Sequence, residues 1–211
     1  MDVKGKHMSG FTINGVGTID GGKFGSLKID GVGKCTDDIE VESIEIDGTF
    51  QCDGNIKAGL FDCDGMAKLK GNLEAKKLDV DGMLTVKNGR VEAEEIHCDG
   101  MIEVSGEVSA DVIEANGYIT AGEIVGDRVS IKSRGNVVGF ALVKIFNKKS
   151  EISMIEATTV ELEGVWAHTV NGRDITIGPR CEIKNVDCNG ALYIDEKATV
   201  GSITGNYTMR K

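Results

Sequence analysis

The sequence is poor in proline, in aromatic side chains and in helical periodicity. It has one proline in 211 residues, and aromatic residues make up 5 % of the chain. So few large rings argue against a globular core built around them, and no stretch has a convincing 3.6-residue apolar period. No apolar run approaches the ~20 residues of a membrane-spanning helix, and residues 1–10 lack the apolar block of a signal peptide. The sequence therefore predicts a protein that is neither transmembrane nor exported by such a signal.

Basic residues are also outnumbered. The chain has 24 basic against 34 acidic residues, for a formal charge of −10. Such a surface repels the phosphate backbone of nucleic acids, so we expect no nucleic-acid partner. A cytoplasmic location fits this charge.

Glycine is abundant, with 29 residues, and it recurs at a fixed interval. Six glycines are separated by 17, 17, 17, 18 and 17 residues, and the first five follow an aspartate. This spacing is the main signal in the sequence, because a fixed period of this kind indicates a repeat architecture. We expect these glycines at chain corners, where they would supply backbone conformations closed to other residues. They are Gly31, Gly48, Gly65, Gly82, Gly100 and Gly117.

Between the glycines, apolar residues occur in pairs with one residue between them. Three such pairs recur in every period, and each pair is typical of a short strand with alternating inward and outward side chains. One period contains Phe50/Cys52, Ile56/Ala58 and Phe61/Cys63, and the next contains Ala67/Leu69, Leu73/Ala75 and Leu78/Val80. A single turn cannot bury its inward side chains, whereas turns stacked ~4.8 Å apart merge them into one core. The sequence predicts an all-β, single-domain parallel β-helix of about 17 residues per turn with a triangular cross-section.

The pattern extends in both directions and has one interruption. We expect a polar N-terminal tail over 1–10, β-helix turns over 11–133, an inserted loop over 134–150, further turns over 151–204 and a C-terminal tail over 205–211. Eleven or so turns would form a rod roughly 50 Å long.

These repeats resemble the bactofilin family of polymer-forming bacterial cytoskeletal proteins, particularly its longer Gram-positive members. Three segments carry the likeness: 15–17 with 29–34, the Gly-x-Φ-x-Φ-x-Gly-x-Φ-x-Ala turns (Φ apolar), and 175–183. The resemblance implies a right-handed β-helix that stacks end to end into nucleotide-independent, non-polar filaments, with no cofactor and a scaffolding role in cell shape or motility. Many members carry an N-terminal membrane-targeting peptide, and the polar segment 1–10 departs from that pattern.

The two ends of the predicted rod are candidate self-association surfaces. A solenoid ends in strands with unpaired N–H and C=O groups, which can template another subunit unless a cap covers them. No capping helix is apparent at either end, although polar tails folded over the ends are an alternative. The predicted contact residues are Phe11, Ile13, Val16, Leu27 and Ile29 at one end, and Leu192, Ile194, Val200 and Ile203 at the other.

The insert at 134–150 is a second candidate site. Apolar residues bordered by lysines are typical of a loop that docks on a membrane surface or a protein partner. The alternative is a loop folded back over the coil with its apolar side buried. The residues concerned are Phe140, Leu142, Val143, Lys144, Ile145, Phe146, Lys148 and Lys149.

Residues that could support chemistry have structural explanations. The repeat assigns most of the six cysteines to core strands, and no Cys-x-x-Cys occurs, so we expect neither metal sites nor disulfides. The Asp-Gly column could bind cations, but each aspartate more simply accepts a turn N–H. His97 points outward with no polar residue placed beside it, which weakens a β-helix acyltransferase. We therefore expect no enzyme; the alternatives are a non-polymerising β-helix adaptor and, third, that acyltransferase.

Overall fold

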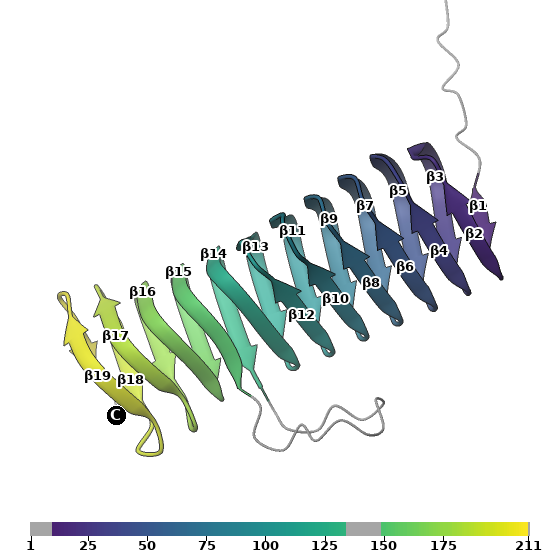
Figure 1. Cartoon of the computed structure of the whole chain (residues 1–211). Coiled ribbons are helices and arrows are strands. Elements are labelled where there is room, and N and C mark those ends of the chain that lie inside the picture. The colour runs from purple at the N-terminus through teal and green to yellow at the C-terminus, as the bar shows by residue number, and fades with distance from the viewer. Residues whose placement is uncertain (1–9, 134–148, 211) are drawn as a thin grey trace, which may run out of the picture.

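The chain forms a straight rod of stacked turns (Figure 1). The computed structural model describes residues 10–133 and 149–210, which contain 20 strands and no helix. Strands pair in parallel with the strands one turn before and one turn after, which gives a β-solenoid of about 11 turns. The all-β parallel fold expected from the sequence is confirmed.

In the first part of the rod, each turn consists of one long and one short strand. The long strands are β3 (Gly22–Ile29), β5 (Ile39–Ile46), β7 (Ile56–Cys63), β9 (Leu73–Val80), β11 (Val91–Cys98) and β13 (Glu107–Ala115). The short strands are β2 (Val16–Ile19), β4 (Val32–Cys35), β6 (Thr49–Cys52), β8 (Met66–Leu69), β10 (Met83–Val86) and β12 (Met101–Val104). Strand β1 (Phe11–Ile13) precedes them and pairs with β3.

Each long strand contains two of the three predicted apolar pairs. In β7 the residues Ile56, Ala58, Phe61 and Cys63 are buried, and two consecutive residues between the pairs are partly exposed. This break in the alternation turns the chain between two faces of the coil without ending the hydrogen-bonded ladder. Three inward pairs per turn are therefore present, although only two strands carry them.

Farther along the rod, the turns shorten and the strands lengthen in β14 (Tyr118–Lys132), β15 (Ser150–Glu163) and β16 (Val165–Ile177). Shorter strands follow in the last turns: β17 (Glu182–Cys188), β18 (Ala191–Ile194), β19 (Thr199–Thr204) and β20 (Thr208–Met209). Ile113 pairs with Val129 after 16 residues, and Val160 pairs with Ile175 after 15. These shorter turns have fewer residues in the connection between the short and the long strand, so the two strands merge into one continuous strand. Strand β20 lies in the segment that the sequence assigned to the tail.

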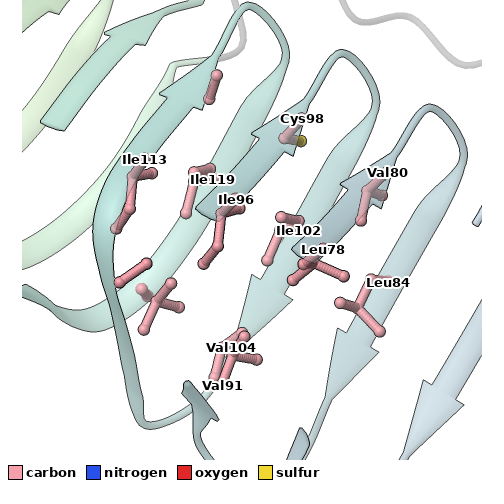
Figure 2. Packing of buried hydrophobic residues seen from close by; sticks show 14 of the residues in the cluster. Leu78, Val80, Leu84, Val91, Ile96, Cys98, Ile102, Val104, Ile113 and Ile119 are labelled. Atoms are coloured by element: carbon pink, nitrogen blue, oxygen red, sulfur yellow. The ribbon is translucent and has the colours of Figure 1, made fainter. Parts of the chain in front are cut away.

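The register of the strands follows the predicted repeat. Ile44 pairs with Phe61, Phe61 with Leu78, and Leu78 with Ile96, so like positions stack on like positions. All four of these side chains are 2 % exposed or less. Figure 2 shows the same stacking deeper in the rod, where Leu78, Ile96 and Ile113 of three successive turns point into one interior. Each fully buried side chain of this size contributes roughly 1.5–3 kcal/mol, and only stacked turns provide that burial.

The corner glycines are required for a different reason from the one expected. Positive φ angles occur at Gly21, Gly22, Gly164 and Gly205, none of which belongs to the corner series. At Gly65, an added Cβ would lie 2.6 Å from the carbonyl oxygen of Asp47 and would overlap that of Gly48. The other five corner glycines meet the preceding corner in the same way. The expectation of special backbone conformations is wrong; close stacking of successive corners excludes a side chain.

Among the described residues there is no helix that is both long and apolar enough to cross a membrane.

Candidate functional site: the rod ends and the base of the insert

The N-terminal turn leaves an unpaired strand edge. Within the described residues, β1 pairs only with β3 and β2 only with β4, so no strand lies on their outer side (Figure 1). Phe11 is 42 % exposed, and its ring centroid lies 6.3 Å from that of Phe24. Ile13 is 5 % exposed and Val16 is 89 % exposed. The predicted residues Phe11, Ile13 and Val16 thus belong to the terminal turn.

The C-terminal turn is open in the same way. Strand β19 pairs only with β17, and β20 only with β18, within the described part of the chain. Ile194, Val200 and Ile203 are partly exposed and pack against the end of the core. Tyr207 and Met209 are exposed beside them, although the sequence analysis did not single them out. Met209 lies one repeat after Leu192, so extending the repeat by one more turn would have identified it.

Three of the predicted end residues lie one turn inside the rod. Leu27 and Ile29 are 1 % and 0 % exposed because β1 and β5 cover β3 on both sides. Leu192 is 0 % exposed and pairs with Met209 of β20. These three side chains support the terminal turns from beneath, so a second copy stacked on the rod would not touch them.

The strands at both open edges lack charged side chains. These edge strands are β1 and β2 at one end, and β19 and β20 at the other. By contrast, the interior strands β7 and β8 contain Lys57, Asp62 and Lys68. Edge strands of monomeric proteins are usually protected by charges, by proline or by a covering element. Neither charge nor proline stands within these four edge strands, and no described element covers them.

The insert begins and ends at a buried pair of serines. The hydroxyl oxygens of Ser133 and Ser150 lie 2.7 Å apart, and both residues are 0 % exposed. The N–H of Ile119 donates to the Ser150 hydroxyl at 3.0 Å. The N–H of Ser133 donates to the Glu163 carbonyl at 2.9 Å. The two chain ends of the insert are therefore held together inside the rod.

Arg180 fixes this base from the next turn. Its Nη2 donates to the Ser133 carbonyl at 2.7 Å and lies 3.4 Å from the Glu163 carboxylate. Arg180 has a φ of 63°, which a non-glycine residue adopts only with strain. Its two bonds to the corner that flanks the insert offset that cost.

Lys149 is the one predicted insert contact in the described part of the chain. Its Nζ lies 2.6 Å from the Glu182 carboxylate, so its charge is paired within the rod. The other predicted residues lie outside the described residues: Phe140, Leu142, Val143, Lys144, Ile145, Phe146 and Lys148.

The aspartate column forms an exposed acidic ladder. The N–H groups of Asp64 and Gly65 both donate to the Ile46 carbonyl, at 3.1 and 2.8 Å, so main-chain carbonyls satisfy the corner amides. Burial, and then the charges of neighbouring carboxylates, raises the pKa of Asp62 and of Asp81. Among the described residues, no group of three or more His, Cys, Asp or Glu side chains is placed to hold a metal ion.

The histidine and cysteine side chains offer little for chemistry. His97 Nε2 lies 3.5 Å from the carboxylate of Asp99 in the acidic ladder, a partner that the sequence analysis missed. All six cysteines are buried and free, including the stacked Cys35 and Cys52. Burial raises the pKa of Cys63 and of Cys98 to about 12, so their thiols stay protonated at neutral pH.

A ladder of amide side chains also escaped the sequence analysis. Asp38 Oδ1 accepts from the N–H of Asn55, Asn55 Oδ1 from that of Asn72, and Asn72 Oδ1 from that of Arg90, at 2.7–3.0 Å. These side chains tie successive corners together along the rod. Their 17-residue spacing directly before the core residues Ile39, Ile56 and Leu73 was the available signal.

Comparison with known proteins gave no relative: no family model, no curated protein and no solved structure matched the chain.

Proposed function

We propose that this chain is a structural protein that self-associates end to end into filaments, as a bactofilin-like cytoplasmic scaffold without a cofactor or catalytic activity. The observation that carries the proposal is that both terminal turns are open and that their edge strands contain no charged side chain. Their strand edges offer unpaired N–H and C=O groups, and their exposed apolar side chains gain burial when another turn covers them.

Stacking of two ends repeats an interaction that the chain already makes about ten times internally. Each internal interface joins parallel strands in register and buries the inward pairs of both turns. A copy placed on an open end would add a ladder of the same kind without a nucleotide or metal. Rods of about 11 turns would then form a filament with a repeat of roughly 50 Å.

The test compares charges placed at an end with a charge placed on the side of the rod. Ile203→Glu introduces a carboxylate at the partly exposed C-terminal turn, whereas Val112→Glu places one on the partly exposed side of β13. Negative-stain microscopy should show filaments for the wild type and for Val112→Glu, and single rods for Ile203→Glu. Filaments of unchanged length in the Ile203→Glu variant, with native circular dichroism, would contradict the proposal.

The N-terminal end is tested separately by Phe11→Glu, because Phe11 is 42 % exposed and its loss leaves the core beneath it intact. Loss of filaments in either end variant supports the proposal. Wild-type protein that stays monomeric at all concentrations, with or without lipid, would instead favour an adaptor that docks through the insert.

A further inference from the structure

One outward-facing column of the rod is uncharged and, apart from Thr49, apolar, where the other outward columns carry charges. It occupies the first position of six successive short strands, β2 to β12, and its members pair directly from turn to turn. Val16 and Val32 are 89 % and 49 % exposed, and the other four are partly exposed. We call this column the methionine stripe; it consists of Val16, Val32, Thr49, Met66, Met83 and Met101.

The stripe is not explained by the core. Strand alternation points its side chains away from the interior, and the inward neighbours Phe50, Ala67 and Leu84 are fully buried beneath it. Six turns at ~4.8 Å give the stripe a length of roughly 24 Å along the rod axis. An outward, uncharged and mostly apolar column of this kind is a candidate contact site. Methionine suits such a site because its flexible thioether adapts to an opposing surface.

The two flanks of the stripe differ in charge. Two residues before the last five stripe positions lies the acidic ladder, from Asp30 to Asp99, whereas Asn14 precedes Val16. The positions two and four residues after the stripe form the lysine flank, whose four lysines outnumber its three acids: Lys34, Lys68, Lys70 and Lys87 against Asp20, Asp53 and Glu103, with Asp53 pairing Lys34 and Lys70. Because every turn runs in the same direction, the acidic flank lies on one side along the whole stripe and the lysine flank lies on the other.

We propose that the methionine stripes of two copies pack against each other side by side, with the two rods parallel and related by a two-fold axis along their length. Turning one rod about that axis brings its acidic flank opposite the lysine flank of its partner. In an antiparallel pair, the same flanks meet acid against acid. Charge complementarity of this kind fixes orientation, and the apolar stripe is self-complementary as a two-fold contact requires.

The crowding of the acidic ladder supports this choice of partner. Asp81 lies among Asp64, Asp79 and Asp99, and burial, followed by the charges of these neighbours, raises the pKa of Asp81. Opposing lysines from a second copy would relieve that repulsion.

A single stripe is narrow, so one pair of rods would bind weakly. When rods are joined end to end, each added rod contributes a further stripe at high effective concentration. The strength of the lateral contact therefore rests on the proposed end-to-end stacking, whereas its geometry does not.

Cysteine cross-linking tests the geometry. A two-fold axis along the rod places residue 83 of both copies at the same height, so Met83→Cys should give a disulfide-linked dimer under mild oxidation. An antiparallel pair centred on the stripe would place residue 83 opposite Val32, about three turns from its own copy. Ser109→Cys, also partly exposed but on another face, is the matched control and should stay monomeric, as should the wild type with its buried cysteines. Absence of the Met83→Cys dimer, or equal cross-linking of Ser109→Cys, would overturn the proposal.

Microscopy separates this contact from the end contact. The double variant Met66→Lys with Met83→Lys should form single filaments where the wild type forms paired ones, and Ser109→Lys should leave the pairs intact. Paired filaments in the double variant would refute the lateral contact alone. Wild-type filaments that are single, but coat vesicles of anionic lipid through the stripe, would also refute it. Loss of all filaments in Ile203→Glu bears only on the ends.

Discussion

Replacing one corner glycine by alanine tests how closely the turns are stacked. Gly65 lies at the corner between β7 and β8, and its φ is not among the positive ones, so alanine can adopt the same backbone conformation. The added Cβ would nevertheless lie 2.6 Å from the Asp47 carbonyl oxygen and 2.7 Å from the Asp47 carbonyl carbon. Two carbon atoms in contact are usually about 3.5 Å or more apart. The corner at Gly65 and the corner at Asp47 and Gly48 must therefore separate by ~1 Å.

The cost follows from the bonds that this separation weakens. The N–H of Gly65 donates to Ile46 at 2.8 Å, and the N–H of Met66 donates to Gly48 at 2.8 Å. Each bond contributes about 1 kcal/mol net, and overpacking of a close-packed site adds about 1–3 kcal/mol. We therefore expect Gly65→Ala to lower the free energy of unfolding by about 4 kcal/mol.

Gly15 provides a matched control in the same column. It belongs to the terminal turn, and an added Cβ meets nothing within 4 Å. Gly15→Ala should therefore be neutral or stabilise the monomer by about 0.4–1 kcal/mol, because alanine restricts the unfolded chain. Urea unfolding of dilute protein followed by circular dichroism measures both changes. Equal effects of the two substitutions would refute the argument that stacked corners exclude a side chain.

Three further predictions concern the insert base, the acidic ladder and the buried thiols. Ser150→Ala removes the hydroxyl that bonds Ser133 and accepts from Ile119. The substitution should lower the free energy of unfolding, measured in urea, by about 1–3 kcal/mol. A decrease below about 0.5 kcal/mol would show that the serine pair does not stabilise the fold. Because the folded pKa of Asp81 is raised, its ionised form costs stability at neutral pH, and that cost disappears as the pH falls through the folded pKa. Asp81→Asn should thus stabilise the protein by about 0.5 kcal/mol at pH 7, after solvent screening. The free energies of unfolding of the variant and the wild type should converge as the pH is lowered. Asp53→Asn should act with the opposite sign at pH 7, because Lys70 lowers the pKa of Asp53. A thiol reagent at pH 8 should modify Cys63 and Cys98 only on unfolding, since their pKa is raised to about 12; rapid reaction of the native protein would show that the interior opens.

The sequence predicted the fold because the repeat encodes the register directly. Inward residues such as Ile44, Phe61 and Leu78 recur at the interval at which the chain stacks, so their spacing gives the pairing. The same spacing does not show how far apart two corners lie, and the role of the corner glycines was therefore misjudged.

The candidate site was less accessible to sequence reasoning. The repeat period predicts which residues stack on one another, but it does not show where the first and last strands lie. Leu27, Ile29 and Leu192 are therefore covered by a further strand and lie one turn inside the rod. Ser150 occupies a core column normally filled by apolar residues, and its bonds to the Ser133 hydroxyl and the Ile119 N–H explain it. The methionine stripe was not predicted, because the repeat signal lies in the inward positions and outward positions of a strand are normally solvated.

The most direct test of end-to-end assembly is cryo-electron microscopy of the purified chain over a range of concentrations. The account predicts filaments whose strand ladder continues across subunit boundaries at ~4.8 Å spacing, with an axial repeat of roughly 50 Å set by about 11 turns. Separate rods at every concentration, or filaments whose subunits touch without stacked terminal turns, would contradict it.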